Sequence, residues 1–141
     1  MLMTIAAYVL AFFTIGWGTG IITAVLLPLS LLFGRGAAGR IANTLTNGVA
    51  TFIATYAVKL ICGWLSVEMT YAMFVLPLIA MVSNDLNRIR RVQTAASFAG
   101  VDISSDPEMR QGMISTERSN LWADLFGFAV AILLLPPMPM F

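Results

Sequence analysis

The chain has 141 residues, of which 59% are hydrophobic and only 11% are charged, and its mean hydropathy is +0.87. Soluble domains carry about 25% charged residues and must expose much of their surface to water, so this composition excludes an ordinary soluble fold. The net charge of +1 provides no field that would attract nucleic acid. We therefore predict an all-α integral membrane protein, a single transmembrane domain over residues 1–141, with the lipid bilayer as its partner.

Four apolar runs predict four transmembrane helices, at about residues 5–33, 41–65, 69–84 and 121–136. The first run has no charged residue and exceeds the about 20 residues that a span needs. It is therefore a tilted helix, a helix kinked near Pro28, or one broken at Gly16-Trp17-Gly18-Thr19-Gly20. We favour a single span, because these glycines allow another helix to approach closely.

The third helix is predicted to extend out of the membrane into the cytoplasm. Apolar residues continue past residue 84 at spacings of three or four, which is typical of one face of an amphipathic helix. They are Val82, Leu86, Ile89, Val92, Ala96 and Ala99. Gly100 is a typical helix stop. Residues 85–120 then form a cytoplasmic arm and loop, which includes a short surface helix, Pro107 to Thr116, capped by Ser105 and Glu108.

Basic residues predict the orientation of these helices. They occur in two of the three connections: Arg35 and Arg40 after the first run, and Arg88, Arg90, Arg91, Arg110 and Arg118 after the third. The remaining turn contains Glu68 and no basic residue. The positive-inside rule places both basic connections in the cytoplasm and, with four spans, both termini outside it. The compactness of the chain leads us to expect a bacterial inner membrane.

Polar residues on the second helix form the main candidate site. Spacings of three or four residues place them along one helical face: Thr44, Asn47, Thr51, Thr55 and Lys59. Polar groups in hydrocarbon need partners, so this polar stripe faces either water or protein. In one interpretation it is the wall of a conduit, with Lys59 near the outer mouth. In the other, the threonines bond their own backbone, Asn47 bonds a neighbouring helix, and Lys59 extends to the surface. Gly48 and Gly63 border the stripe and predict close helix contact in both cases.

The junction of the third helix with the cytoplasm is the second candidate site. Arg88, Arg90 and Arg91 would contact anionic lipid headgroups and fix the orientation. Alternatively, they would form a docking surface for another copy or another subunit. Asp124, near the start of the fourth run, would pair with this arginine cluster or act as a proton relay.

No motif in the sequence indicates catalysis or a cofactor. The chain has no histidine, and Cys62 is its only cysteine, which excludes an internal disulfide and makes zinc, haem and Cys–His chemistry improbable. We predict a non-enzymatic multispan membrane protein, without metal or cofactor, that acts through assembly. The leading hypothesis is a homo-oligomeric membrane complex or a small pore or channel. The alternative is an accessory or scaffold subunit of a larger membrane complex.

Overall fold

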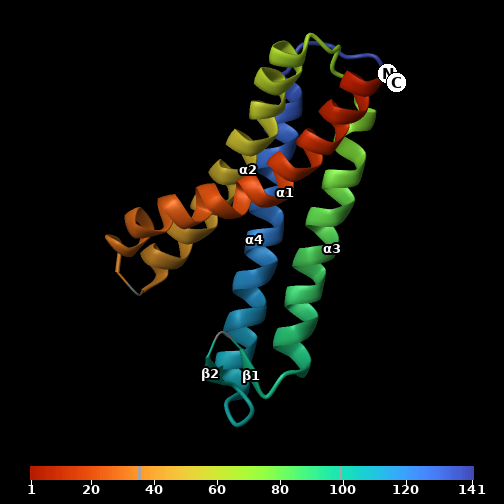
Figure 1. Cartoon of the computed structure of the whole chain (residues 1–141). Coiled ribbons are helices and arrows are strands. Elements are labelled where there is room, and N and C mark those ends of the chain that lie inside the picture. The colour runs from red at the N-terminus through yellow and green to blue at the C-terminus, as the bar shows by residue number, and fades with distance from the viewer. Residues whose placement is uncertain (35, 99) are drawn as a thin grey trace.

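The computed structural model describes residues 1–34, 36–98 and 100–141, without the side chains of residues 30, 31, 98 and 101. In these ranges the chain forms four α-helices and a pair of two-residue strands (Figure 1). In chain order they are α1 (Leu2–Leu31), α2 (Ala37–Leu65), α3 (Ala72–Thr94), β1 (Ser97–Phe98), β2 (Val101–Asp102) and α4 (Pro107–Leu134). Arg35 and Ala99, which entered the predicted orientation and the predicted amphipathic face, lie outside the described residues.

Three of these helices are long and apolar enough to cross a membrane: α1 over Leu2–Leu29, and α2 and α3 over their full lengths. The first apolar run is one continuous helix, which passes through its glycines and through Pro28 without a break. The 28 residues of this candidate span extend about 42 Å at about 1.5 Å per residue, and the hydrocarbon layer of a bilayer is only about 30 Å thick. A crossing α1 must therefore tilt. The chain is an all-helical membrane protein.

The fourth predicted span is not supported. α4 runs unbroken from Pro107 to Leu134, so the predicted short surface helix and the predicted fourth helix are one element. Ser119 lies within this helix, and its hydroxyl donates to the carbonyl oxygen of Ser115, one turn earlier, at 3.0 Å. The apolar part of α4, residues 121–134, extends only about 21 Å, which is less than the about 30 Å thickness of the hydrocarbon layer.

The predicted cytoplasmic extension of the third helix is not supported either. α3 as a whole is long and apolar enough to be a span, and nothing in its geometry marks an end near residue 84. The helix also ends at Thr94, six residues before the predicted stop at Gly100. It ends there because the chain turns back on itself through β1 and β2, with Gly100 at φ +78° in the left-handed region.

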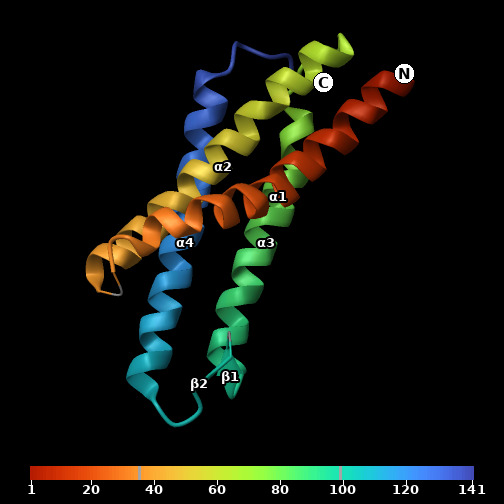
Figure 2. The same ribbon diagram turned by 60° about the vertical axis from the view of Figure 1, so that its left-hand side comes forward.

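The helices form two antiparallel pairs that meet at one end of the molecule and diverge at the other. α1 packs on α2 and α3, and α4 packs on the same two helices. Both chain termini lie at the end where the pairs meet (Figure 1). A second view shows the turn between α1 and α2 well separated from the turn between α3 and α4 (Figure 2).

The apolar core lies where all four helices converge. Each helix contributes to it: Ala7, Ala11 and Ile15 from α1, Val58 and Cys62 from α2, Met73 and Phe74 from α3, and Phe128 from α4 with Leu135 just beyond it. The rings of Phe74 and Phe128 meet edge to face with their centroids 6.2 Å apart. Such aromatic pairs contribute about 0.5–1.5 kcal/mol beyond the area they bury. The core therefore ties α3 to α4 most firmly near the chain termini.

The chain segment after α4 caps the start of α3. The first N–H groups of a helix have no partner within the helix, and Tyr71, the N-cap residue of α3, provides no side-chain hydrogen bond. Backbone carbonyl oxygens of Pro139 and Met140 accept instead, from the N–H groups of Tyr71 at 3.0 Å and Ala72 at 3.2 Å. Prolines keep this segment out of a helix, so its carbonyl groups are free to satisfy α3.

Two aspartates order the loop that leads into α4. Asp102 accepts from the Ser104 hydroxyl at 2.6 Å and from the Ser104 N–H at 2.9 Å, and these two bonds hold the pKa of Asp102 below its ordinary value. Asp106 accepts from the N–H of Met109 at 2.9 Å and is the N-cap of α4. The predicted cap at Ser105 is therefore wrong by one residue.

α2 and α4 approach each other to backbone contact at two glycines. A Cβ atom on Gly48 would lie 3.0 Å from the carbonyl oxygen of Ala123, and a Cβ on Gly127 would overlap the carbonyl oxygen of Gly48. Gly48 thus makes the close contact that the sequence predicts. Gly63 does not, because a Cβ there would have no neighbour within 4 Å.

Gly127→Ala should destabilise the fold by about 1–3 kcal/mol, because the new methyl group would force the two backbones apart. Gly63→Ala is the matched control and should be neutral or stabilising by up to about 1 kcal/mol, since alanine favours a helix and finds open space there. Thermal unfolding in detergent measures both variants. Equal stability of the two would contradict the backbone contact.

Candidate functional site

A buried polar cluster joins α2, α3 and α4. Its members are Thr44 and Thr51 from α2, Asp85 and Arg88 from α3, and Glu117, Asn120 and Asp124 from α4. The three α4 residues are spaced by three and four positions, which puts them on one helical face. Each of these three is only 8% exposed. Buried polar and charged groups inside a membrane helix bundle are expensive and commonly functional, so this polar cluster is the candidate site.

The shorter of two side-chain hydrogen bonds between described residues of α2 and α4 joins Thr51 to Asp124. The Thr51 hydroxyl donates to Asp124 Oδ1 at 2.5 Å, and Thr51 is fully buried. Closer to the start of both helices, two turns earlier on α2 and one turn earlier on α4, the Thr44 hydroxyl donates to Asn120 Oδ1 at a longer 3.4 Å. A carboxylate acceptor makes the first bond the stronger one.

Arg88 and Glu117 join α3 to α4 through a forked ion pair. The Arg88 Nε and Nη2 atoms donate to the two carboxylate oxygens of Glu117 at 3.1 and 3.2 Å. Asp85 lies one turn earlier on α3, is 8% exposed, and is within electrostatic range of Asp124, Arg88 and Glu117. Its Oδ2 atom is buried and has no hydrogen-bond partner among the described residues.

The polar stripe on α2 is distributed between the cluster and the surface. Thr51 and Thr55 are fully buried, Thr44 and Asn47 are half-buried, and Lys59 is exposed. Thr51 bonds α4 rather than its own backbone, and the Thr55 hydroxyl has no partner among the described residues. The Lys59 ammonium lies 3.5 Å from the Tyr56 hydroxyl and 5.5 Å from the centre of that ring. Thr44 and Thr51 thus make contacts between helices, and a water-filled conduit along the stripe stays a prediction.

The three arginines of the second candidate site occupy different environments. Arg88 is half-exposed and is committed to Glu117, so it belongs to the polar cluster. Arg90 and Arg91 have exposed side chains near the end of α3. Their contact with lipid headgroups or a partner protein stays a prediction.

Sequence reasoning missed Asp85, Glu117 and Asn120 as site residues. The signal was present in the spacing of Glu117, Asn120 and Asp124 by three and four residues, which is the spacing of polar residues on one face of a helix. The predicted break before the fourth run concealed it, because Glu117 lay in the predicted loop and Asp124 in a separate span. Asp85 and Arg88, three residues apart on α3, provide the complementary face.

Thr51→Val should destabilise the protein by about 1 kcal/mol, since it removes a hydrogen bond to a buried carboxylate. Thr55→Val is the matched control: Thr55 is equally buried on the same helix, and its hydroxyl has no partner within the described part of the chain, so its loss should be neutral or stabilising. The double variant Thr51→Val with Asp124→Leu should show coupling of about 0.6–1.7 kcal/mol in a double-mutant cycle. Equal costs at residues 51 and 55, measured by unfolding in detergent, would contradict the assignment.

The polar cluster can hold three helices in register and can hold charge away from water. No group of three or more His, Cys, Asp or Glu side chains within the described ranges is arranged to hold a metal ion. Comparisons of the chain with protein-family models, with curated protein sequences and with solved structures find no match.

Proposed function

We propose that the chain functions by assembling with copies of itself in the membrane, through the outward face of α1. The observation that carries this proposal is the position of Gly16 and Gly20. Both are exposed, and a Cβ atom added to either would have no neighbour within 4 Å. Their separation of four residues puts them on one side of α1. This is the G-x-x-x-G arrangement through which membrane helices approach each other closely.

Gly18, which points the opposite way, is the glycine that α1 uses for packing within the chain. A Cβ on Gly18 would lie 3.7 Å from the side chain of Ala54 on α2. Internal packing therefore accounts for Gly18 and not for Gly16 or Gly20. A glycine inside a helix is less favourable than alanine by about 1 kcal/mol, so two outward glycines fit a face that contacts another helix.

Two aromatic side chains lie beside these glycines. Phe13 is 48% exposed, Trp17 is 72% exposed, and their rings meet edge to face with centroids 6.1 Å apart. They provide rigid apolar area next to a surface without side chains. A second α1 could therefore place its own aromatic rings against the exposed glycine backbone, which supports a self-complementary contact.

If the chain is instead an accessory or scaffold subunit, the same face of α1 would contact a different protein. The size of the assembly that the chain forms alone separates the two proposals. A pore or channel within such an assembly stays a prediction that rests on the polar stripe of α2.

Gly16→Ile and Gly20→Ile should each raise the dissociation constant of the oligomer at least about tenfold, because each side chain keeps the second helix about a side-chain width away. Gly63→Ile, at another exposed helical glycine with open space, should leave the assembly unchanged. Analytical ultracentrifugation in detergent measures all three variants. A monomeric wild-type chain would move the proposal to the accessory subunit, and intact oligomers in both α1 variants would contradict the α1 interface.

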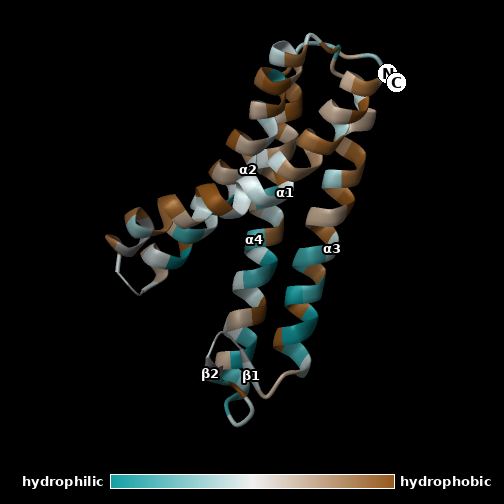
Figure 3. Ribbon diagram, viewed as in Figure 1, coloured by the Kyte–Doolittle hydropathy of each residue, from teal (hydrophilic) through white to brown (hydrophobic). Residues whose placement is uncertain are grey.

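We further propose that α4 also returns across the membrane beside α3. The membrane would be a bacterial inner membrane, and both termini would lie on its side away from the cytoplasm. Supporting this, the carbonyl groups of Pro139 and Met140 bind the first residues of α3. The polar residues of α3 and α4 are gathered in the halves next to β1 and β2 (Figure 3). Neighbouring helices can complete the crossing of a short apolar helix, since Glu117, Asn120 and Asp124 of α4 are buried rather than exposed to lipid.

Single cysteines at Ser66, Ser104 and Met140, each in a Cys62→Ser background, test this topology. Ser66 and Met140 should react with a membrane-impermeant thiol reagent from one side of the membrane, and Ser104 from the other. The Cys62→Ser chain alone is the unlabelled control. If the cysteine of Met140→Cys reacted from the same side as that of Ser104→Cys, the fourth crossing would be excluded. The comparison of Ser66→Cys with Ser104→Cys would still test whether α3 crosses the membrane.

A further inference from the structure

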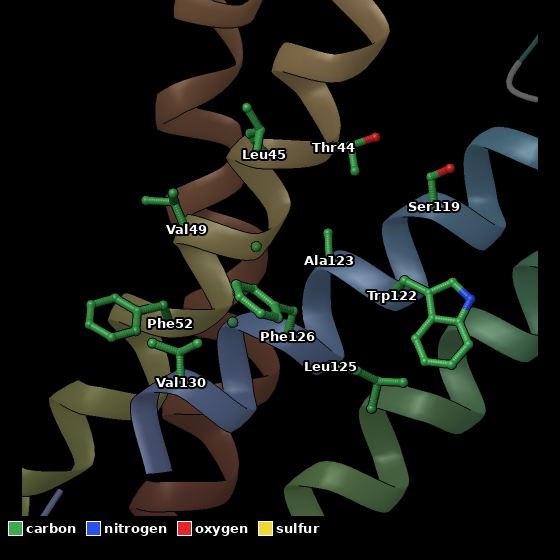
Figure 4. Close-up of a pocket in the computed structure, with 12 residues that line it drawn as sticks. Thr44, Leu45, Val49, Phe52, Ser119, Trp122, Ala123, Leu125, Phe126 and Val130 are labelled. Carbon is green, nitrogen blue, oxygen red and sulfur yellow. The ribbon is translucent and has the colours of Figure 1, made fainter. Parts of the chain in front are cut away.

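An apolar groove opens between α2 and α4, alongside their glycine contact. It encloses a cavity of about 850 Å³. Apolar side chains from both helices line it, among them Leu45, Val49, Phe52, Trp122, Phe126 and Val130 (Figure 4). Trp122 and Phe126 are 70% and 72% exposed, so the groove is open to the surroundings of the molecule. The volume lies within the about 300–1,000 Å³ that is typical of small-molecule sites.

A smaller polar cavity continues this groove toward the start of both helices. It has a volume of about 350 Å³, and Thr44 and Ser119 line both cavities. Its lining includes Arg40 and no acidic residue. Among the residues that the structure describes, neither the Arg40 guanidinium nor the Ser115 hydroxyl has a hydrogen-bond or ion-pair partner. The polar end of the groove therefore offers unused donors and one positive charge.

We propose that this groove binds a phospholipid with an anionic headgroup. The phosphate accepts from Arg40 and Ser115, because a guanidinium matches the geometry of phosphate oxygens. An acyl chain lies along the apolar groove as far as Phe52, twelve residues beyond Arg40. That distance is about 18 Å along a helix, close to the about 15 Å of hydrocarbon in one leaflet.

A lipid fits this pair of cavities better than a helix of a second copy does. A transmembrane helix would fill the apolar part but would bring no anion to Arg40, whereas a phospholipid satisfies both parts at once. The site is also independent of the proposed assembly, since it lies on α2 and α4 while the outward glycines lie on α1. Failure of one therefore does not imply failure of the other.

Native mass spectrometry of the detergent-purified chain tests the site with dioleoyl phosphatidylglycerol and dioleoyl phosphatidylcholine. The anionic lipid should bind at least about fivefold more tightly, and Arg40→Gln should remove that preference. Arg40→Lys should keep most of it, and Arg118→Gln, an exposed arginine outside the cavity lining, should keep all of it. Val49→Trp, which fills the groove, should reduce binding of both lipids at least about fivefold, and Leu60→Trp on the exposed end of α2 should not.

Three outcomes would overturn the proposal. The first is an unchanged preference for phosphatidylglycerol in Arg40→Gln. The second is inorganic phosphate that binds as tightly as the lipid and still binds to Val49→Trp, which would assign the site to a free anion. The third is a wild-type chain that retains no lipid while Val49→Trp disrupts its oligomer, which would assign the groove to a second copy.

Discussion

The backbone contact between Gly48 of α2 and Gly127 of α4 is the constraint on which the other features of this structure depend. Lipid provides no hydrophobic force between apolar helices, so their association relies on close packing and on hydrogen bonds. Only glycine lets these two backbones meet, because a Cβ on Gly127 would overlap the Gly48 carbonyl group. At that separation the short side chain of Thr51 can bond Asp124 directly, at 2.5 Å. A wider gap would leave this carboxylate without its partner in a medium that has no water.

The same contact separates the polar cluster, which is largely buried, from the apolar groove, which is open. On one side of the α2–α4 contact, Asp124 is close to Asp85 and to the Arg88–Glu117 pair, so α3 joins the cluster. Three carboxyl groups lie together there with one arginine, which is itself half-exposed. On the other side lies the apolar groove, since two helices in backbone contact leave a furrow between their diverging side chains. The buried cluster and the lipid-sized groove are thus two faces of one helix crossing.

The sequence predicts the helical class and the apolar runs of α1, α2 and α3, because continuous apolar composition is a strong signal over about 20 residues. It predicts α4 less well. A polar stretch followed by an apolar one reads as a surface helix and a separate span, but helix propensity does not stop where polarity changes, and Ser119 bonds backward to Ser115. Partners between helices were not predictable either. Spacing shows that Thr51 and Asp124 each lie on a polar face, whereas their pairing depends on which helices are neighbours, and that is set by the glycine contacts.

The divergence of the two helix pairs explains why so much apolar surface stays exposed in one chain. α1 and α2 are held to α3 and α4 by the core near the termini and by the α2–α4 crossing, and the two pairs diverge beyond that crossing (Figure 2). α1 packs more extensively on α2 than on α3, and Gly16 and Gly20 on its outward side are open. The angle between the pairs also opens the polar cavity at Arg40 onto the apolar groove. In a bilayer a concave groove is well suited to a lipid chain, and a flat glycine surface is well suited to another helix. The two proposed contacts, with lipid on α2 and α4 and with a second chain on α1, thus follow from a fold that packs tightly at one end and opens at the other.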